Sequence, residues 1–152
     1  MIRLFLISLI AAFSCLGVGC TRFEGGDRDL WGTWHLVKIE KTMVDDTAYD
    51  GNTFWKFQAD VVLIQEVDDD MHERIDHFGT WSLDRNENTL TLYFNHSDDN
   101  SAEGTGVYVP PSSIGIGRLT VLNIKTLDKG KMILSHTGAD DIGYVYFLER
   151  YF

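Results

Sequence analysis

Short runs of alternating apolar and polar residues, separated by charged tips, make up most of the chain from residue 30 onward. Alternation at every second position is typical of strands that bury one face. No long stretch has the spacing and end signals of a helix, and residues 41–50 carry only a weak helical pattern. We therefore expect eight strands: Leu30–Glu40, Thr53–Ala59, Val61–Val67, Glu73–Leu83, Thr89–Asn95, Leu119–Leu127, Lys131–His136 and Gly143–Tyr151.

Most connections between these strands are short and polar, as in Asp68-Asp69-Asp70 and Asp128-Lys129-Gly130. Such tips between β-rich runs are hairpin signals, and many short strands joined by hairpins predict an all-β antiparallel sandwich or barrel. The exception is Ser97–Arg118, which is much longer and rich in glycine and serine. Loops of that length are usually functional or without fixed structure.

The first nineteen residues differ from the rest. Arg3 precedes an almost wholly apolar run, Leu4–Phe13, which only Ser8 interrupts. This run is too short to span a bilayer and has the length of a signal-peptide core. The chain therefore begins with a predicted signal peptide.

The end of that signal, Leu16-Gly17-Val18-Gly19-Cys20, resembles the lipobox of bacterial lipoproteins, in which the acylated cysteine begins the mature chain. Gly17 departs from the pattern, because a leucine-like residue usually stands there. Cys15 is a rival acceptor with a poorer fit, and an ordinary secretory signal with an incidental cysteine is the alternative. The resemblance implies a signal peptide over residues 1–19, lipidated Cys20, a tether over 20–29 and one β domain over 30–152.

Lipidation at Cys20 would attach the protein to the cell envelope, since each buried CH₂ of an acyl chain contributes about 0.8 kcal/mol. It would also leave no thiol in the mature chain for a disulfide. Thr21 follows Cys20, where an aspartate is associated with retention at the inner membrane. The outer membrane is therefore favoured, on either face.

The formal net charge of −10 excludes nucleic acid as a partner, because the phosphate backbone would repel the protein. An acidic membrane surface would also repel it, so attachment to a bilayer must be covalent or hydrophobic. The apolar content of 44% is enough to fill the core of one domain of 152 residues.

Two short motifs and the end of the last strand carry a resemblance to a known family. Leu-x-Gly-x-Trp-x-Leu occurs at residues 30–36, Gly-x-Trp-x-Leu recurs at residues 79–83, and Arg150 closes the last strand. The chain resembles the lipocalins and, more closely, the lipocalin-like domain lipoproteins of Bacteroidetes-type bacteria. The resemblance implies an eight-stranded antiparallel up-and-down barrel over Leu30 to the C-terminus.

The same resemblance implies a plug at one end of the barrel. Trp34 would pack across the closed end and Arg150 would stack on it, a cation–π contact of roughly 0.5–2 kcal/mol. Gly32 would allow the backbone to approach the plug closely. The alternative is that Arg150 is a solvated residue near the C-terminus.

An eight-stranded barrel is just wide enough to be filled by side chains or to hold one small ligand. Inward-facing aromatic and polar residues form the candidate ligand pocket, although the same residues would serve equally well as packed core. A ligand-storing barrel requires a cavity open at one end. The pocket candidates are Trp55, Phe57, His77, Trp81, Tyr144 and Tyr146.

No catalytic residue, metal ligand set or cofactor motif is predicted. The five histidines occur singly, without the spacing of a zinc site, and the acidic clusters lack the pattern of a calcium loop. No Gly-x-Ser-x-Gly elbow is present. His77 beside a carboxylate is the only acid–base candidate, so we expect no enzyme.

We therefore predict a lipid-anchored envelope lipoprotein whose barrel binds a small hydrophobic molecule. The alternative is a module that binds an envelope protein or glycan, through Ser97–Arg118 or through exposed aromatic residues such as Trp31 and Tyr108. Asp46-Thr47-Ala48 also resembles a bacterial O-glycosylation motif.

Overall fold

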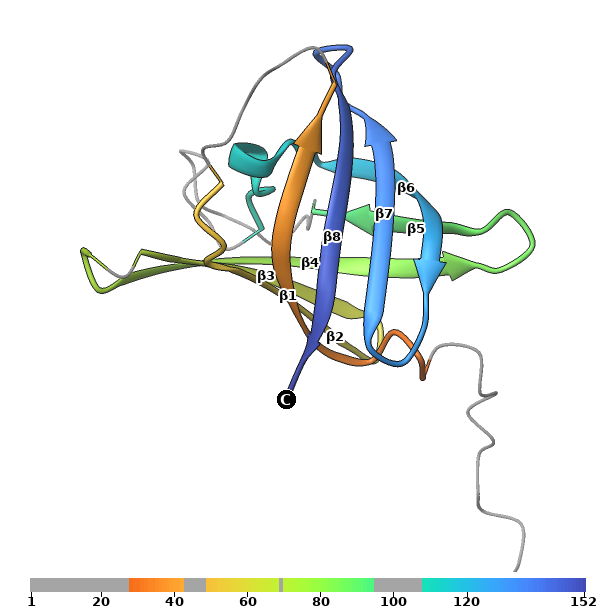
Figure 1. Cartoon of the computed structure of the whole chain (residues 1–152), viewed down its shortest axis with the longest axis horizontal. Helices are drawn as coiled ribbons and strands as arrows, with labels where there is room; N and C mark the ends of the chain where they lie inside the picture. Colours follow the sequence, from red (N-terminus) through yellow and green to blue (C-terminus); the bar gives the residue numbers. More distant parts are fainter. Residues whose placement is uncertain (1–27, 43–48, 69, 95–107) are drawn as a thin grey trace, which may run out of the picture.

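The computed structural model describes residues 28–42, 49–68, 70–94 and 108–152, in which eight antiparallel strands form one closed barrel (Figure 1). Each strand pairs with its sequence neighbours, and β1 closes the barrel by pairing with β8. The strands are β1 (Gly32–Lys41), β2 (Thr53–Gln58), β3 (Val61–Asp68), β4 (Glu73–Asp84), β5 (Thr89–Tyr93), β6 (Leu119–Leu127), β7 (Lys131–Thr137) and β8 (Gly143–Tyr151).

The predicted eight-stranded barrel is therefore confirmed, and the strand boundaries differ by one or two residues. β1 begins at Gly32 because Leu30 belongs to a turn whose carbonyl accepts the indole N–H of Trp34. β2 ends at Gln58 because Ala59 has a positive φ of 50°, which starts the turn to β3. The weak helical pattern over 41–50 falls mainly on residues outside the described part of the chain.

A single 3-10 turn, η2 (Ser112–Ile114), is the helix found among the described residues. No helix within these ranges has the length and apolarity needed to cross a membrane.

Alternation along the strands places one apolar face inside the barrel. A register shift in β1 between Leu36 and Lys38 changes the parity of that strand, so Ile39 and Lys41 face inward after Trp34 and Leu36. This bulge brings a lysine to one end of the inner surface.

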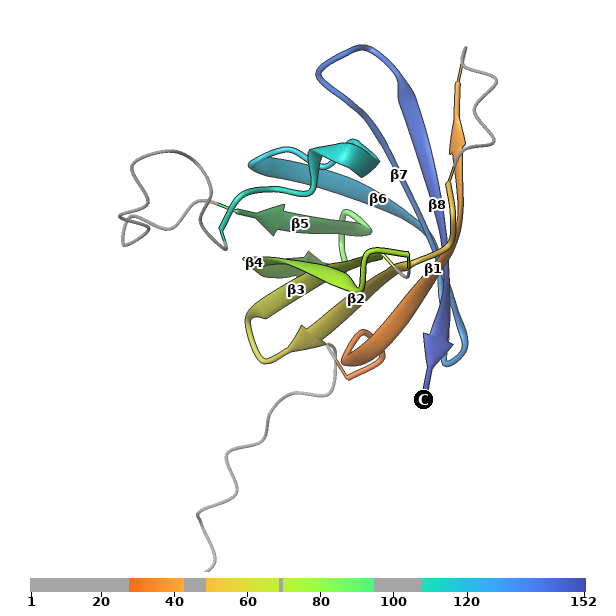
Figure 2. The ribbon, with the colours of Figure 1, turned by 90° about the vertical axis from the view of Figure 1, so that its left-hand side faces the viewer.

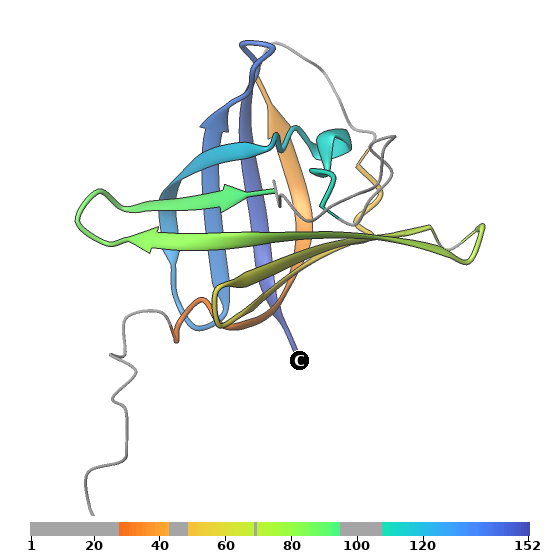
Figure 3. The same cartoon turned by 180° about the vertical axis from the view of Figure 1, so that it is seen from behind.

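The two ends of the barrel differ. The turn at residues 28–30 and the β2–β3, β4–β5 and β6–β7 hairpins lie at one end, which we call the closed end (Figure 2). The β1–β2, β3–β4, β5–β6 and β7–β8 connections lie at the other, the open end. Figure 3 shows from behind that the η2 segment sits at this open end. The long connection predicted at Ser97–Arg118 therefore joins strands at the open end.

Candidate functional site

Trp34 and Arg150 meet at the closed end of the barrel. The Trp34 side chain is fully buried, and its indole N–H donates to the Leu30 carbonyl at 2.8 Å. The guanidinium carbon of Arg150 lies 4.0 Å from the centroid of the Trp34 ring. The two residues are also cross-strand partners, Trp34 on β1 and Arg150 on β8.

Arg150 also holds the backbone around this end. Its guanidinium donates to the carbonyls of Asp29 at 2.6 Å, Lys129 at 3.2 Å and Trp31. Gly32 has a φ of +118°, and a Cβ there would lie 2.8 Å from Nη1 of Arg150. The structure thus brings together the three residues expected at the plug, and Gly32 leaves the room that the guanidinium occupies.

The six residues of the candidate pocket are all buried inside the barrel. The rings of Trp55 and Tyr146 lie 5.6 Å apart, and Phe57 meets Trp81 edge-on at the same distance. All of them except His77 belong to the hydrophobic core cluster, and none of the six lines the cavity described next. The indole nitrogens of Trp55 and Trp81 have no hydrogen-bond acceptor within the described ranges.

A cavity of about 430 Å³ lies above this aromatic core, at the open end. We call it the mouth cavity. Its lining mixes aliphatic side chains with carboxylates, hydroxyls and an amide. The residues are Ile39, Lys41, Tyr49, Asp50, Asn52, Thr53, Glu66, Val67, Asp68, Glu73, Ile75, Ser113 and Ile114.

Residues 108–118, which we call the mouth loop, cover part of this end. Pro111, Ile114 and Ile116 of the loop are buried against the barrel. Hydrogen bonds from three barrel and loop side chains help to hold the loop in place. The His77 Nδ1 donates to the Val109 carbonyl at 2.7 Å, the Ser113 hydroxyl donates to Glu66 Oε1 at 2.5 Å, and the Tyr146 hydroxyl donates to the Ile114 carbonyl at 2.8 Å.

His77 is buried between two acceptors. Its Nδ1 faces the Val109 carbonyl, and its Nε2 lies 3.5 Å from Glu66 Oε1. Only the imidazolium form can donate toward both. Burial alone would lower the pKa of His77, but Glu66, Val109 and the nearby Asp76 outweigh it and hold the pKa above its ordinary 6.5. Nδ1 is hydrogen-bonded to the mouth loop, whereas Nε2 makes an ion-pair contact with Glu66 but no hydrogen bond within the described residues.

This arrangement predicts a pH-dependent contribution to stability. Interaction with His77 and the Ser113 bond lower the pKa of Glu66 below its ordinary 4.5, so its contribution is complete above that value and lost at more acidic pH. The raised pKa of His77 makes its contribution complete below 6.5 and lost as pH rises through the raised pKa. The pair should stabilise the mouth loop most between pH 4.5 and 6.5.

The test compares the free energy of unfolding of the unaltered protein with that of His77→Gln, whose amide can still donate to Val109. We expect a difference on the order of 1 kcal/mol at about pH 5.5 that shrinks at about pH 9. Denaturant titration at both pH values measures it. An equal difference at both would contradict the ionised pair.

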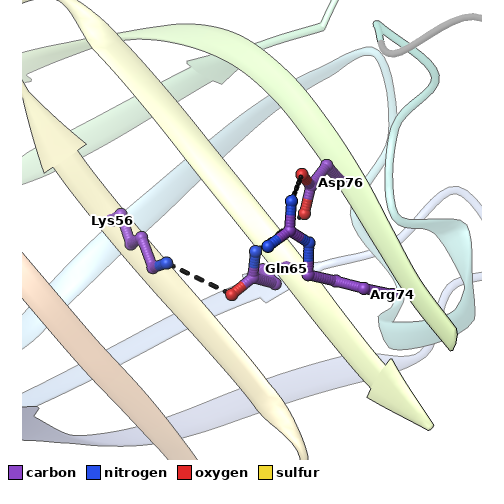
Figure 4. Close-up of polar contacts among 4 residues, drawn as sticks. All are labelled: Lys56, Gln65, Arg74 and Asp76. Atoms are coloured by element: carbon purple, nitrogen blue, oxygen red, sulfur yellow. Dashed lines mark hydrogen bonds and ion pairs between the residues drawn. The ribbon is translucent and has the colours of Figure 1, made fainter. Parts of the chain in front are cut away.

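A row of polar side chains crosses the outside of β2, β3 and β4 (Figure 4). Lys56 donates to Gln65 at 3.2 Å, Gln65 donates to Asp76 at 2.8 Å, and Arg74 donates to the other oxygen of Asp76 at 2.9 Å. These residues satisfy one another across the strands. The row therefore stabilises the sheet and is not a candidate binding site.

The two aromatic residues expected on the surface are half-buried in the structure. Trp31 is half-buried and packs against the core, because its turn is folded under the closed end, so the expectation of an exposed aromatic residue is corrected there. Tyr108 is half-buried as well. Cys20, Asp46-Thr47-Ala48 and residues 97–107 lie outside the described residues.

The mouth cavity was not among the sites predicted from the sequence. Glu66 carried a signal that was available: it follows Val62 and Ile64 at the inward-facing positions of a strand, and a carboxylate there belongs near the strand end. Ser113 and Tyr49 lie outside any alternating run, so no periodic signal pointed to them. Among the described residues, no group of three or more His, Cys, Asp or Glu side chains is arranged to hold a metal ion.

Comparison with known families and structures supports a lipocalin-like barrel. The family model described as "Lipocalin-like domain" matches residues 13–140, and the chain belongs to that family. No curated protein matches its sequence significantly.

Three solved structures share the fold. A lipocalin-like protein from Bacteroides uniformis is 16% identical with a TM-score of 0.54, and the match covers 81% of this chain and 99% of that one. A protein from Bacteroides eggerthii is 17% identical with a TM-score of 0.61, over 80% and 98% of the two chains. Insecticyanin from the tobacco hornworm Manduca sexta is 11% identical with a TM-score of 0.51, over 81% and 62%.

Proposed function

We propose that this protein is a lipid-anchored lipoprotein of the bacterial cell envelope that binds a small molecule in the mouth cavity. The observation that carries the binding function is a cavity of about 430 Å³ at the open end of a barrel whose other end is sealed. That volume lies within the range of small-ligand sites in proteins. We place the site at the mouth because none of the six interior candidates lines the cavity there.

Native mass spectrometry of the protein purified from its own host tests the binding function. We expect a co-purifying small molecule that is lost in Asn52→Trp, which places a large ring at the rim of the cavity. A melting temperature unchanged in that variant would show that the barrel is intact. Mass spectra without any bound small molecule in the unaltered protein would contradict the proposal.

The proposed lipid anchor is supported by the apolar run Leu4–Phe13 and by Gly19-Cys20 after it. Membrane fractionation tests it with a matched pair of substitutions. Cys20→Ser should move the protein from the outer-membrane fraction to the soluble one, whereas Cys15→Ser should leave it in the membrane. Release by Cys15→Ser instead would assign the lipid to the rival cysteine.

The alternative function, binding of an envelope protein or glycan, depended on exposed aromatic residues and on the long connection. Trp31 no longer supports it, and residues 109–116 pack onto the barrel mouth. The mouth cavity therefore favours the small-molecule function.

A further inference from the structure

Charge is unevenly distributed around the mouth cavity. Among the described residues, four carboxylates line it, from Asp50, Glu66, Asp68 and Glu73, against one lysine, Lys41. His77 beside Glu66 would add at most one positive charge, which does not reverse the balance. The formal net charge of −10 acts in the same direction at long range. The potential at the mouth is therefore negative.

Glu66 is the carboxylate best placed to act on a bound molecule. Its side chain is 25% exposed and lies inside the cavity wall, where solvent screens a charge less than on the surface. Ser113 and His77 both contact Oε1. These contacts fix the carboxylate, and because no described residue contacts Oε2, that oxygen can accept a hydrogen bond from a ligand.

Part of the remaining cavity wall is apolar or hydrogen-bonded within the protein. Ile39, Val67 and Ile114 contribute aliphatic wall. The Tyr49 hydroxyl donates to the Leu36 carbonyl at 2.6 Å and accepts from the Thr53 N–H, so its ring remains as contact surface. Burial raises the pKa of Tyr49 to about 12, which keeps it neutral.

We propose that the mouth cavity selects small molecules that carry a protonated amine on a short apolar body, and disfavours organic anions of the same size. The ammonium donates to Glu66 Oε2, and the apolar body packs against the isoleucines and the Tyr49 ring. This inference rests on the proposed function, because it names the ligand class of that same cavity. Charge-assisted bonds of this kind are about twice as strong as neutral ones.

Three probes that share a phenethyl skeleton test the selection: phenethylamine, phenethyl alcohol and hydrocinnamate. Titrations of the purified protein, followed by amide chemical shifts of Val67, Ile75 and Ile114, give the three dissociation constants. We expect the amine to bind at least about tenfold more tightly than the alcohol, and the anion more weakly than either. Raising the salt concentration should reduce the difference in affinity between the amine and the other two probes.

Three variants assign the effect to the cavity. Glu66→Gln keeps an oxygen that can accept from Ser113, and it should bring amine binding within about threefold of alcohol binding. Glu73→Gln, at the rim and away from the mouth-loop contacts, should weaken only the amine, by about two- to threefold. Glu87→Gln removes a carboxylate from the β4–β5 tip at the closed end and should change none of the constants.

The outcomes separate the two proposals. Alcohol or anion binding as tight as that of the amine would overturn the amine selection and leave the cavity as a binding site. An equal loss with Glu87→Gln and Glu66→Gln would assign the preference to overall charge and overturn the role of Glu66. Shifts for none of the three probes would overturn both proposals.

Discussion

Trp34→Ala should lower the free energy of unfolding by about 3–5 kcal/mol, a large part of the stability of a domain of this size. The side chain is fully buried, and its removal leaves a cavity where the inner face of β1 meets the closed end. It also removes the indole bond to the Leu30 carbonyl and the ring on which Arg150 stacks. Urea denaturation followed by circular dichroism measures the change.

Two further variants show which interaction is lost. Trp34→Phe keeps a ring under the guanidinium and should cost markedly less than Trp34→Ala. Arg150→Ala, combined with Trp34→Ala in a double-mutant cycle, should give a coupling energy of roughly 0.5–2 kcal/mol. If Trp34→Ala lowered the free energy of unfolding by less than about 1 kcal/mol, the closed end would not depend on the Trp34–Arg150 contact.

Gly79→Ala should destabilise the protein by about 1–3 kcal/mol, even though alanine normally suits a strand better than glycine. Gly79 lies on β4 at a position that faces the interior of the barrel, and it pairs with Val62 of β3. A Cβ there would lie 2.7 Å from the Tyr93 carbonyl oxygen and 2.9 Å from the Phe94 ring. Because the first of these atoms belongs to the backbone of β5, the two strands would have to separate.

Gly117→Ala is the matched control, since it makes the same chemical change near the other end of the β5–β6 connection. Its added Cβ would meet nothing closer than Thr120 Oγ1 at 3.9 Å, and its φ is not in the left-handed region. It should alter the unfolding free energy by less than about 0.5 kcal/mol. Equal effects of the two substitutions in denaturant titration would refute the steric argument.

The barrel could be predicted because its strands and hairpins are marked by patterns of neighbouring residues. Alternation in β2 and β4 is enough to place Trp55, Phe57 and Trp81 inside, and the polar tips mark the hairpins. The closed end was predictable from the resemblance, since Gly32, Trp34 and Arg150 fall on its short motifs. Gly79 gains a physical explanation only from the fold, which places the Phe94 ring where its side chain would be.

The mouth cavity could not be predicted in the same way, because its residues come together through connections with no periodicity. Ser113 reaches Glu66 from a loop 47 positions away in the sequence. The bulge in β1 shifts the inward parity from Glu40 to Lys41, and no residue pattern marks where such a shift occurs. Alternation identifies inward aromatic residues but does not show whether they line a pocket or, as here, pack into the core away from the mouth cavity.

The chain enters the barrel at its sealed end, since Asp29 is bound there by Arg150. Under the proposed anchoring, an acylated Cys20 would lie eight residues before Arg28, and eight residues span at most about 29 Å when fully stretched. The plugged base would then sit near the bilayer, with the acidic opening directed into the aqueous compartment. Cargo would be exchanged with water-borne molecules and not drawn sideways out of the lipid leaflet.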